Sequence, residues 1–232
     1  MKNNFKAILF DLDGTLIDVN MNTFIARYFK LLSEKLSHMV EPKEFISKIM
    51  KASKAIENNN GEKLNEEAFK EHFFPINGYQ WDDLNHIFDD FYDNEFSELK
   101  KYTNKVPGAR DVVQRAFDEG YTVVIATTPL LPKTAALQRL EWAGLGDFPY
   151  ELVTSYEDSH ATKPNLYYYK EILDKIDCEP ERALMVGDDE KDLVAANLGC
   201  RTFWIEDNSQ KIGSDIPEPT YKGKLTDLLE II

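Results

Sequence analysis

The stretch Phe10–Leu16 reads Phe-Asp-Leu-Asp-Gly-Thr-Leu, and it continues a short apolar run, Ala7–Phe10. Such a run ending in carboxylates is typical of a buried strand that reaches the edge of its sheet. Side chains two apart on a strand point to the same face. We therefore expect Asp11 and Asp13 to converge on one spot while Leu12 packs the other way.

Two carboxylates held this close repel each other, by roughly 4 kcal/mol at about 4 Å and an effective dielectric constant near 20. A protein tolerates such a pair when a cation lies between the carboxylates or when they share a proton. A small set of hard oxygen ligands favours Mg²⁺. The stretch therefore predicts a magnesium site where the first strand ends, followed by a sharp turn that Gly14 permits.

The second half of the chain alternates strands with helices. Runs rich in β-branched and apolar residues occur near 121–127, 151–154, 183–189 and 201–205, separated by amphipathic segments. This alternation predicts an α/β fold with a doubly wound parallel sheet. Ligands bind such sheets at the carboxyl ends of the strands, which is where Asp11, Thr127, Lys163 and Asp188 fall.

Between the first strand and this region the pattern is helical. Apolar residues recur at three- and four-residue steps from about residue 22 to 104, and the aromatic residues among them are expected to form a core. The sequence thus predicts an α/β core made of 1–20 and 105–232, with an α-helical domain inserted at 21–104. The two connections are short and polar, which favours hinge motion.

The segment Asp11–Leu16 resembles the first motif of the haloacid dehalogenase (HAD) superfamily, in the form found in its phosphatases. Three further segments resemble the remaining motifs in the right order: Thr127 at a strand end, Lys163 followed by Pro164, and the acidic Gly187–Asp192. The chain is similar to the phosphoglycolate phosphatase-like branch, whose HAD-like Rossmannoid core carries a helical C1 cap. The inserted helices occupy the place of that cap.

The resemblance implies catalytic roles for Asp11, Asp13, Thr127 and Lys163. In the family the first Asp attacks phosphorus to form an aspartyl-phosphate, and the second acts as acid and base. Thr127 and Lys163 are expected to bind the phosphoryl group, the first by a hydrogen bond and the second by its charge. Thr128, which stands where the family often has Asn, is a further candidate for substrate binding.

The resemblance also implies a set of metal ligands. Asp11, the backbone carbonyl of Asp13 and Asp188 are expected to bind Mg²⁺. Asp192 is expected to bind the metal through water or to orient the lysine of the third motif. Asp189 is interpreted as a charge at a helix N-terminus, with any contact to the metal left open.

Composition limits the partners. The 232 residues carry a net charge of −14, which argues against nucleic acid and anionic membranes because both bind basic patches. The N-terminus lacks the pattern of a signal peptide, and no apolar run approaches the length of a membrane span. Cys178 and Cys200 are interpreted as free thiols. The expected protein is cytoplasmic, and a monomer or a homodimer.

The predicted function is Mg²⁺-dependent hydrolysis of a small phosphorylated metabolite through an aspartyl-phosphate. Three alternatives stay open at this point. A sugar-phosphate mutase would use the same two aspartates, whereas a 2-haloacid dehalogenase needs neither Asp13 nor the metal. A non-catalytic phosphate-binding regulatory protein would be expected to lack one of the four motifs, and none is lacking here.

Overall fold

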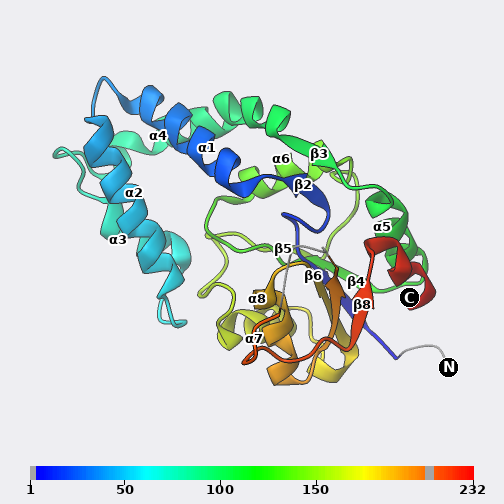
Figure 1. Ribbon diagram of the computed structural model, residues 1–232. Coiled ribbons are helices and arrows are strands. Elements are labelled where there is room, and N and C mark those ends of the chain that lie inside the picture. The colour runs from blue at the N-terminus through cyan, green and yellow to red at the C-terminus, as the bar shows by residue number, and fades with distance from the viewer. Residues whose placement is uncertain (1–3, 207–211) are drawn as a thin grey trace.

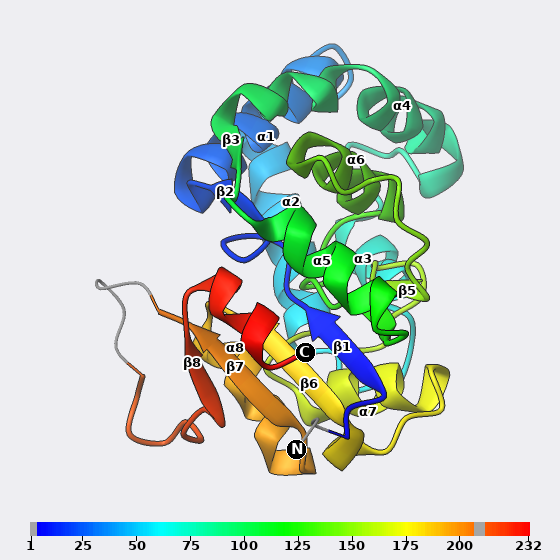
Figure 2. The same ribbon diagram turned by 90° about the vertical axis from the view of Figure 1, so that its right-hand side faces the viewer.

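A parallel sheet forms the centre of the computed structural model, which describes residues 4–206 and 212–232. Within these residues six strands pair in the order β5-β4-β1-β6-β7-β8, and every pairing is parallel (Figures 1 and 2). Their bounds are Ala7–Phe10 (β1), Thr122–Ile125 (β4), Leu152–Val153 (β5), Ala183–Gly187 (β6), Arg201–Ile205 (β7) and Tyr221–Gly223 (β8). The predicted α/β fold is thus confirmed.

The alternation of side chains along β1 explains why both faces of the sheet are covered. Ile8 and Phe10 belong to an apolar cluster with α5 (Ala109–Asp118) and the terminal 3₁₀ helix η4 (Leu225–Glu230). Ala7 and Leu9 belong to a second cluster that includes α7 (Leu166–Lys175). Other elements of the core are α6 (Lys133–Ala143), α8 (Glu190–Leu193), η2 (Pro180–Arg182) and η3 (Val194–Leu198).

The helical segment lies beyond one end of the sheet (Figure 1). It consists of α1 (Met21–Leu36), α2 (Pro42–Glu57), α3 (Asn65–Phe73), α4 (Trp81–Asp93) and η1 (Glu95–Tyr102). The side chain of Asn20 caps α1 by accepting a hydrogen bond from the Thr23 amide at 3.0 Å. Aromatic rings fill the interior of the helical segment. The ring of Tyr28 packs edge-on against those of Phe91 and Phe96, with centroid distances of 5.8 and 6.2 Å.

The two connections to this segment run side by side. β2 (Ile17–Val19) pairs antiparallel with β3 (Thr103–Lys105), so the chain enters and leaves through one two-stranded ribbon. Residues 18 and 104 pair directly in this ribbon, and the Asn104 side chain donates to the Asp18 carboxylate at 3.2 Å. These are the connections in which the sequence predicted hinge motion.

The helical segment also touches the core away from this ribbon, which the sequence did not predict. Phe96 stacks on Trp142 of α6 with centroids 5.4 Å apart. The loop between α2 and α3 reaches the core as well, where the Gly61 amide donates to the His160 carbonyl at 3.0 Å. One apolar cluster therefore runs from the helical segment into the core without interruption.

Two local features also differ from the sequence-based expectations. The helix expected to open at Lys163 begins at Leu166, because the Asn165 side chain caps it by accepting from the Tyr167 amide at 2.9 Å. Strands β2, β3 and β8 were not predicted. No helix among residues 4–206 and 212–232 is long and apolar enough to cross a membrane.

Candidate active site

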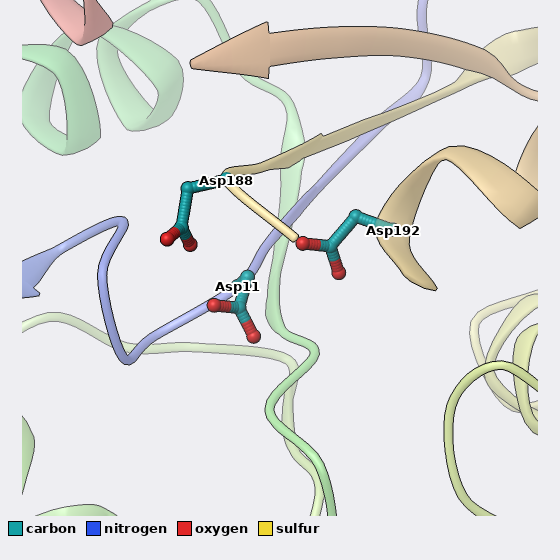
Figure 3. A group of neighbouring side chains, drawn as sticks. All are labelled: Asp11, Asp188 and Asp192. Atoms are coloured by element: carbon teal, nitrogen blue, oxygen red, sulfur yellow. The ribbon is translucent and has the colours of Figure 1, made fainter. Parts of the chain in front are cut away.

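Adjacent strands bring the predicted carboxylates together. β1 and β6 pair with Phe10 opposite Val186, and the amide of Asp11 donates to the Val186 carbonyl at 2.8 Å. Asp188 therefore follows its strand beside Asp11, and α8 adds Asp192. One carboxylate oxygen from each lies within 4.8 Å of the others, and Figure 3 shows the three side chains gathered at this edge.

Two glycines make this approach possible. Gly14 has a φ of +90°, and a Cβ atom there would lie 2.2 Å from Oδ2 of Asp188. A Cβ atom on Gly187 would lie 1.9 Å from Oδ2 of Asp192. Both distances are shorter than real contacts allow, so each carboxylate sits directly against glycine backbone.

Lys163 neutralises part of this charge. Its Nζ donates to Asp11 Oδ1 at 2.6 Å and to Asp192 Oδ1 at 2.5 Å, and all three side chains are buried. Burial opposes the charged lysine, but the charges of Asp11 and Asp192 outweigh it and raise the pKa of Lys163 well above its usual value. The lysine therefore stays charged beside the carboxylates.

No lysine or arginine among the described residues forms an ion pair with the Asp188 carboxylate. It accepts a hydrogen bond from the Thr15 hydroxyl at 2.9 Å. Burial, followed by the charge of Asp11, raises its pKa to about 6. Burial is also the main cause that raises the pKa of Asp11, and the lysine only partly counters it. The cluster is thus short of positive charge.

Thr127 lies two residues beyond the end of β4. Its carbonyl accepts from the Thr154 hydroxyl at 2.7 Å and from the Tyr168 hydroxyl at 2.8 Å, which fixes this end of the strand. Thr127 and Thr128 line the same cavity as Asp11, Asp13 and Lys163. The structure thus brings both threonines to the site.

Asp13 faces a different partner from Asp11. Its Oδ2 accepts a hydrogen bond from Arg139 of α6, which is 4% exposed, and its Oδ1 is buried with no hydrogen-bond partner. Leu12 between the two aspartates packs into the α5-side cluster, as expected, and both aspartates line one cavity, although their carboxylates bind different cations. Sequence reasoning missed Arg139, although a charged residue four positions from the apolar Ala135 and next to Leu140 was a visible signal.

Two further predicted features can be placed. Asp189 caps α8: its carboxylate, on a half-exposed side chain, accepts from the Lys191 amide at 2.9 Å. Cys178 and Cys200 are free and buried, and burial raises the pKa of the Cys200 thiol to about 12. Neither cysteine lies in the site, so a catalytic thiol finds no support here.

A cavity of about 320 Å³ lies between the carboxylates and the helical segment. The core contributes Asp11, Asp13, Thr127, Thr128, Arg139 and Lys163 to its wall. The opposite wall consists of side chains from α1, α2 and α3. A small molecule bound here would contact both the polar side chains at the sheet edge and the helices above it.

Comparisons with known proteins agree with this architecture. A family model for haloacid dehalogenase-like hydrolases matches residues 5–198. The pyrophosphatase PpaX of Bacillus velezensis is 29% identical over 229 residues, covering 97% of this chain and 95% of that protein. A HAD phosphatase from Thermococcus onnurineus superposes with a TM-score of 0.60 at 23% identity, covering 98% and 97% of the two chains.

A dehalogenase solved with an intermediate complex has a TM-score of 0.63 at 15% identity, covering 100% of this chain and 99% of that one. The solved structures therefore support the fold but do not distinguish the two chemistries. The family model spans most of the chain, so this protein belongs to the haloacid dehalogenase-like hydrolases. The predicted family is confirmed, and the chain is a hydrolase.

Proposed function

We propose that the protein is a Mg²⁺-dependent phosphatase that hydrolyses a small phosphorylated metabolite through an aspartyl-phosphate on Asp11. The balance of charge in the site carries this proposal. Two cations, Lys163 and Arg139, face four carboxylates, those of Asp11, Asp13, Asp188 and Asp192. When all four carboxylates are ionised, two negative charges remain, and one divalent cation would neutralise them.

The oxygens present fit such an ion. Asp11, Asp188 and Asp192 supply carboxylate oxygens, the donor type that Mg²⁺ prefers, and Asp13 would add its backbone carbonyl. Because Asp192 also holds Lys163, we assign it a water-mediated or orienting role. Bound Mg²⁺ would offset the repulsion between Asp11 and the substrate phosphate.

The residues of the chain account for the remaining steps. Asp11 attacks phosphorus and the P–O bond to the leaving group breaks. For this step Asp13 must carry a proton on its unpaired Oδ1; it passes this proton to the departing oxygen and, as a carboxylate, then takes one from the water that releases phosphate. Lys163, Thr127 and Thr128 bind the phosphoryl oxygens by charge and by hydrogen bonds.

Asp13 and Asp188 favour a phosphatase over a dehalogenase, which needs neither. The name of the B. velezensis relative agrees, since that protein is a pyrophosphatase. We propose that residues 21–104 act as a cap that covers the site and selects the leaving group, and that 1–20 and 105–232 form the catalytic core. The free thiols support a cytoplasmic location, and we propose a monomer or a homodimer.

The test is hydrolysis of p-nitrophenyl phosphate by metal-free protein with added Mg²⁺, followed by acid quenching with a labelled substrate. We expect activity only with the metal, and label on the protein that Asp11→Asn abolishes. Turnover of Asp11→Asn within tenfold of the parent would overturn the assignment of the nucleophile. Activity on an organic halide in chelator, with none on the phosphate ester, would make the protein a dehalogenase. Phosphoryl transfer to a sugar phosphate instead of water would make it a mutase.

A further inference from the structure

We infer that the leaving group of the substrate is apolar, so that the enzyme acts on a small alkyl or aryl phosphate monoester rather than on pyrophosphate or a sugar phosphate. This inference rests on the proposed phosphatase function and names the class of substrate for the same site. The observation that carries it is the chemistry of the cavity wall opposite the carboxylates.

That wall is almost wholly hydrocarbon. α1 contributes Met21, Ile25 and Phe29, whereas Ile49 and Phe69 come from α2 and α3. Tyr28 also lines the cavity, but its hydroxyl is 2.8 Å from that of Tyr92, so it is engaged inside the helical segment. Ser53 is then the one other hydroxyl that the described part of the segment offers. A sugar would leave several hydroxyl groups without partners there.

The cations of the cavity all belong to the core and already have partners. Lys163 is bound to Asp11 and Asp192, and Arg139 is bound to Asp13. Lys191 is half-exposed and lies 3.8 Å from Asp189. The helical wall itself carries no cation among the described lining residues, so a second phosphate placed against it would bring negative charge to an apolar surface.

The size of the cavity limits the leaving group further. Its volume of about 320 Å³ must hold the phosphoryl group and the leaving group together. Ligand cavities generally span roughly 300–1,000 Å³, so this one lies at the small end. A short alkyl chain or a single aromatic ring is the kind of group that fits.

The experiment measures kcat and KM for ethyl, butyl and hexyl phosphate, with phenyl phosphate, pyrophosphate and glucose 6-phosphate alongside. The alkyl alcohols are chemically similar as leaving groups, so differences among them report binding. Each methylene buried should raise kcat/KM by about fourfold until the cavity is full. The gain should appear as a lower KM with nearly constant kcat, because the contact is equal in ground and transition states. Equal kcat/KM for the three alkyl phosphates, or a higher kcat/KM for pyrophosphate than for any of them, would overturn the inference.

A matched pair of variants tests the wall directly. Met21 lines the cavity, whereas Met50 is exposed on α2 outside it. Met21→Lys should raise the activity on pyrophosphate relative to butyl phosphate, and Met50→Lys should leave this ratio unchanged. An unchanged ratio in Met21→Lys would contradict the placement of the leaving group against α1.

The failure of this inference can be separated from that of the proposed function. If no ester and no pyrophosphate is hydrolysed with Mg²⁺, the phosphatase assignment fails. If phosphate is released, but best from pyrophosphate or the sugar phosphate, the phosphatase stands and only the apolar leaving group is wrong.

Discussion

Asp13 shows how one side chain can have two different surroundings. Arg139 binds Oδ2, whereas Oδ1 faces no hydrogen-bond partner although it is buried. In the proposed mechanism this free oxygen exchanges a proton with the leaving group. Arg139 acts through Asp13 in this arrangement, so we regard it as a positioning residue.

Arg139→Ala should therefore lower kcat by about a hundredfold, the loss typical of a misplaced catalytic group, while KM changes little. Arg139→Lys should recover part of kcat, because a charge is restored without the planar guanidinium. Steady-state kinetics on p-nitrophenyl phosphate measure both, with circular dichroism to confirm folding. Arg115→Ala on the exposed face of α5 is the control. A large rise in KM at constant kcat would instead place Arg139 on the substrate.

The position of Asp188 beside Asp11 leads to a prediction about the thermal stability of the metal-free protein. Its carboxylate adds to the repulsion with Asp11, so Asp188→Asn should raise the Tm of the protein in EDTA. Mg²⁺ at a hundred times its Kd should raise the Tm of the parent by about 5–10 °C, and the variant should lose this response. Asp189→Asn should keep it, since that carboxylate caps α8. A full Mg²⁺ response in Asp188→Asn would remove Asp188 from the metal site.

At the scale of elements, the loop between α2 and α3, together with the first residue of α3, fastens the helical segment to the core. Asn65 is fully buried, and its Nδ2 donates to the Ala161 carbonyl at 3.0 Å and reaches the Pro129 carbonyl at 3.4 Å. Asn59 orients it by donating to its Oδ1 at 2.9 Å. The two carbonyls belong to the loops that carry Thr127 and Lys163, so this contact joins the helices to the site.

Asn65→Ala should weaken this contact by about 1–3 kcal/mol, since buried carbonyls lose their donor. The amides of Gly61 and Asn65, which bond to core carbonyls at 3.0 and 2.8 Å, should then exchange hydrogen faster. Hydrogen-exchange mass spectrometry of this loop measures the effect. Asn60→Ala is the matched control, because Asn60 is exposed and makes one long contact of 3.4 Å to Asn165. Equal exchange in both variants would show that Asn65 does not hold the loop.

The whole molecule shows which features a sequence can predict. Asp11 and Asp188 were predictable because parallel strands end at one edge, and local patterns locate those ends. Arg139 and Asp13 are separated by 126 positions, and no local pattern links them. The partners of Asn65, Pro129 and Ala161, lie 64 and 96 positions away, so no local pattern indicates that contact either. Strand β8 has three residues, which are too few to show a recognisable alternation of side chains. It is part of the sheet because it pairs with β7.

The same long-range contacts change what is expected of the helical segment. Its separate core and short connections suggested an independent unit, but Phe96 stacks on Trp142, and one apolar cluster crosses the boundary. Deleting the segment would expose that face of α6. Motion of the helical segment relative to the core is therefore better tested in the intact protein, by holding the segment against the core.

A reversible crosslink between the α2–α3 loop and α7 provides that test. Asn60 and Tyr167 are exposed, and the Tyr167 ring lies 2.9 Å from where a Cβ on Gly61 would be. We predict that Asn60→Cys/Tyr167→Cys, joined by a bifunctional methanethiosulfonate, loses most of its turnover and regains it with dithiothreitol. The reason is that substrate must enter between the helices and the carboxylates, which requires this loop to leave the core. Cys178 and Cys200 are buried and should not react, and each single variant treated alike is a control. Full turnover in the crosslinked protein would show that the closed arrangement admits substrate without opening.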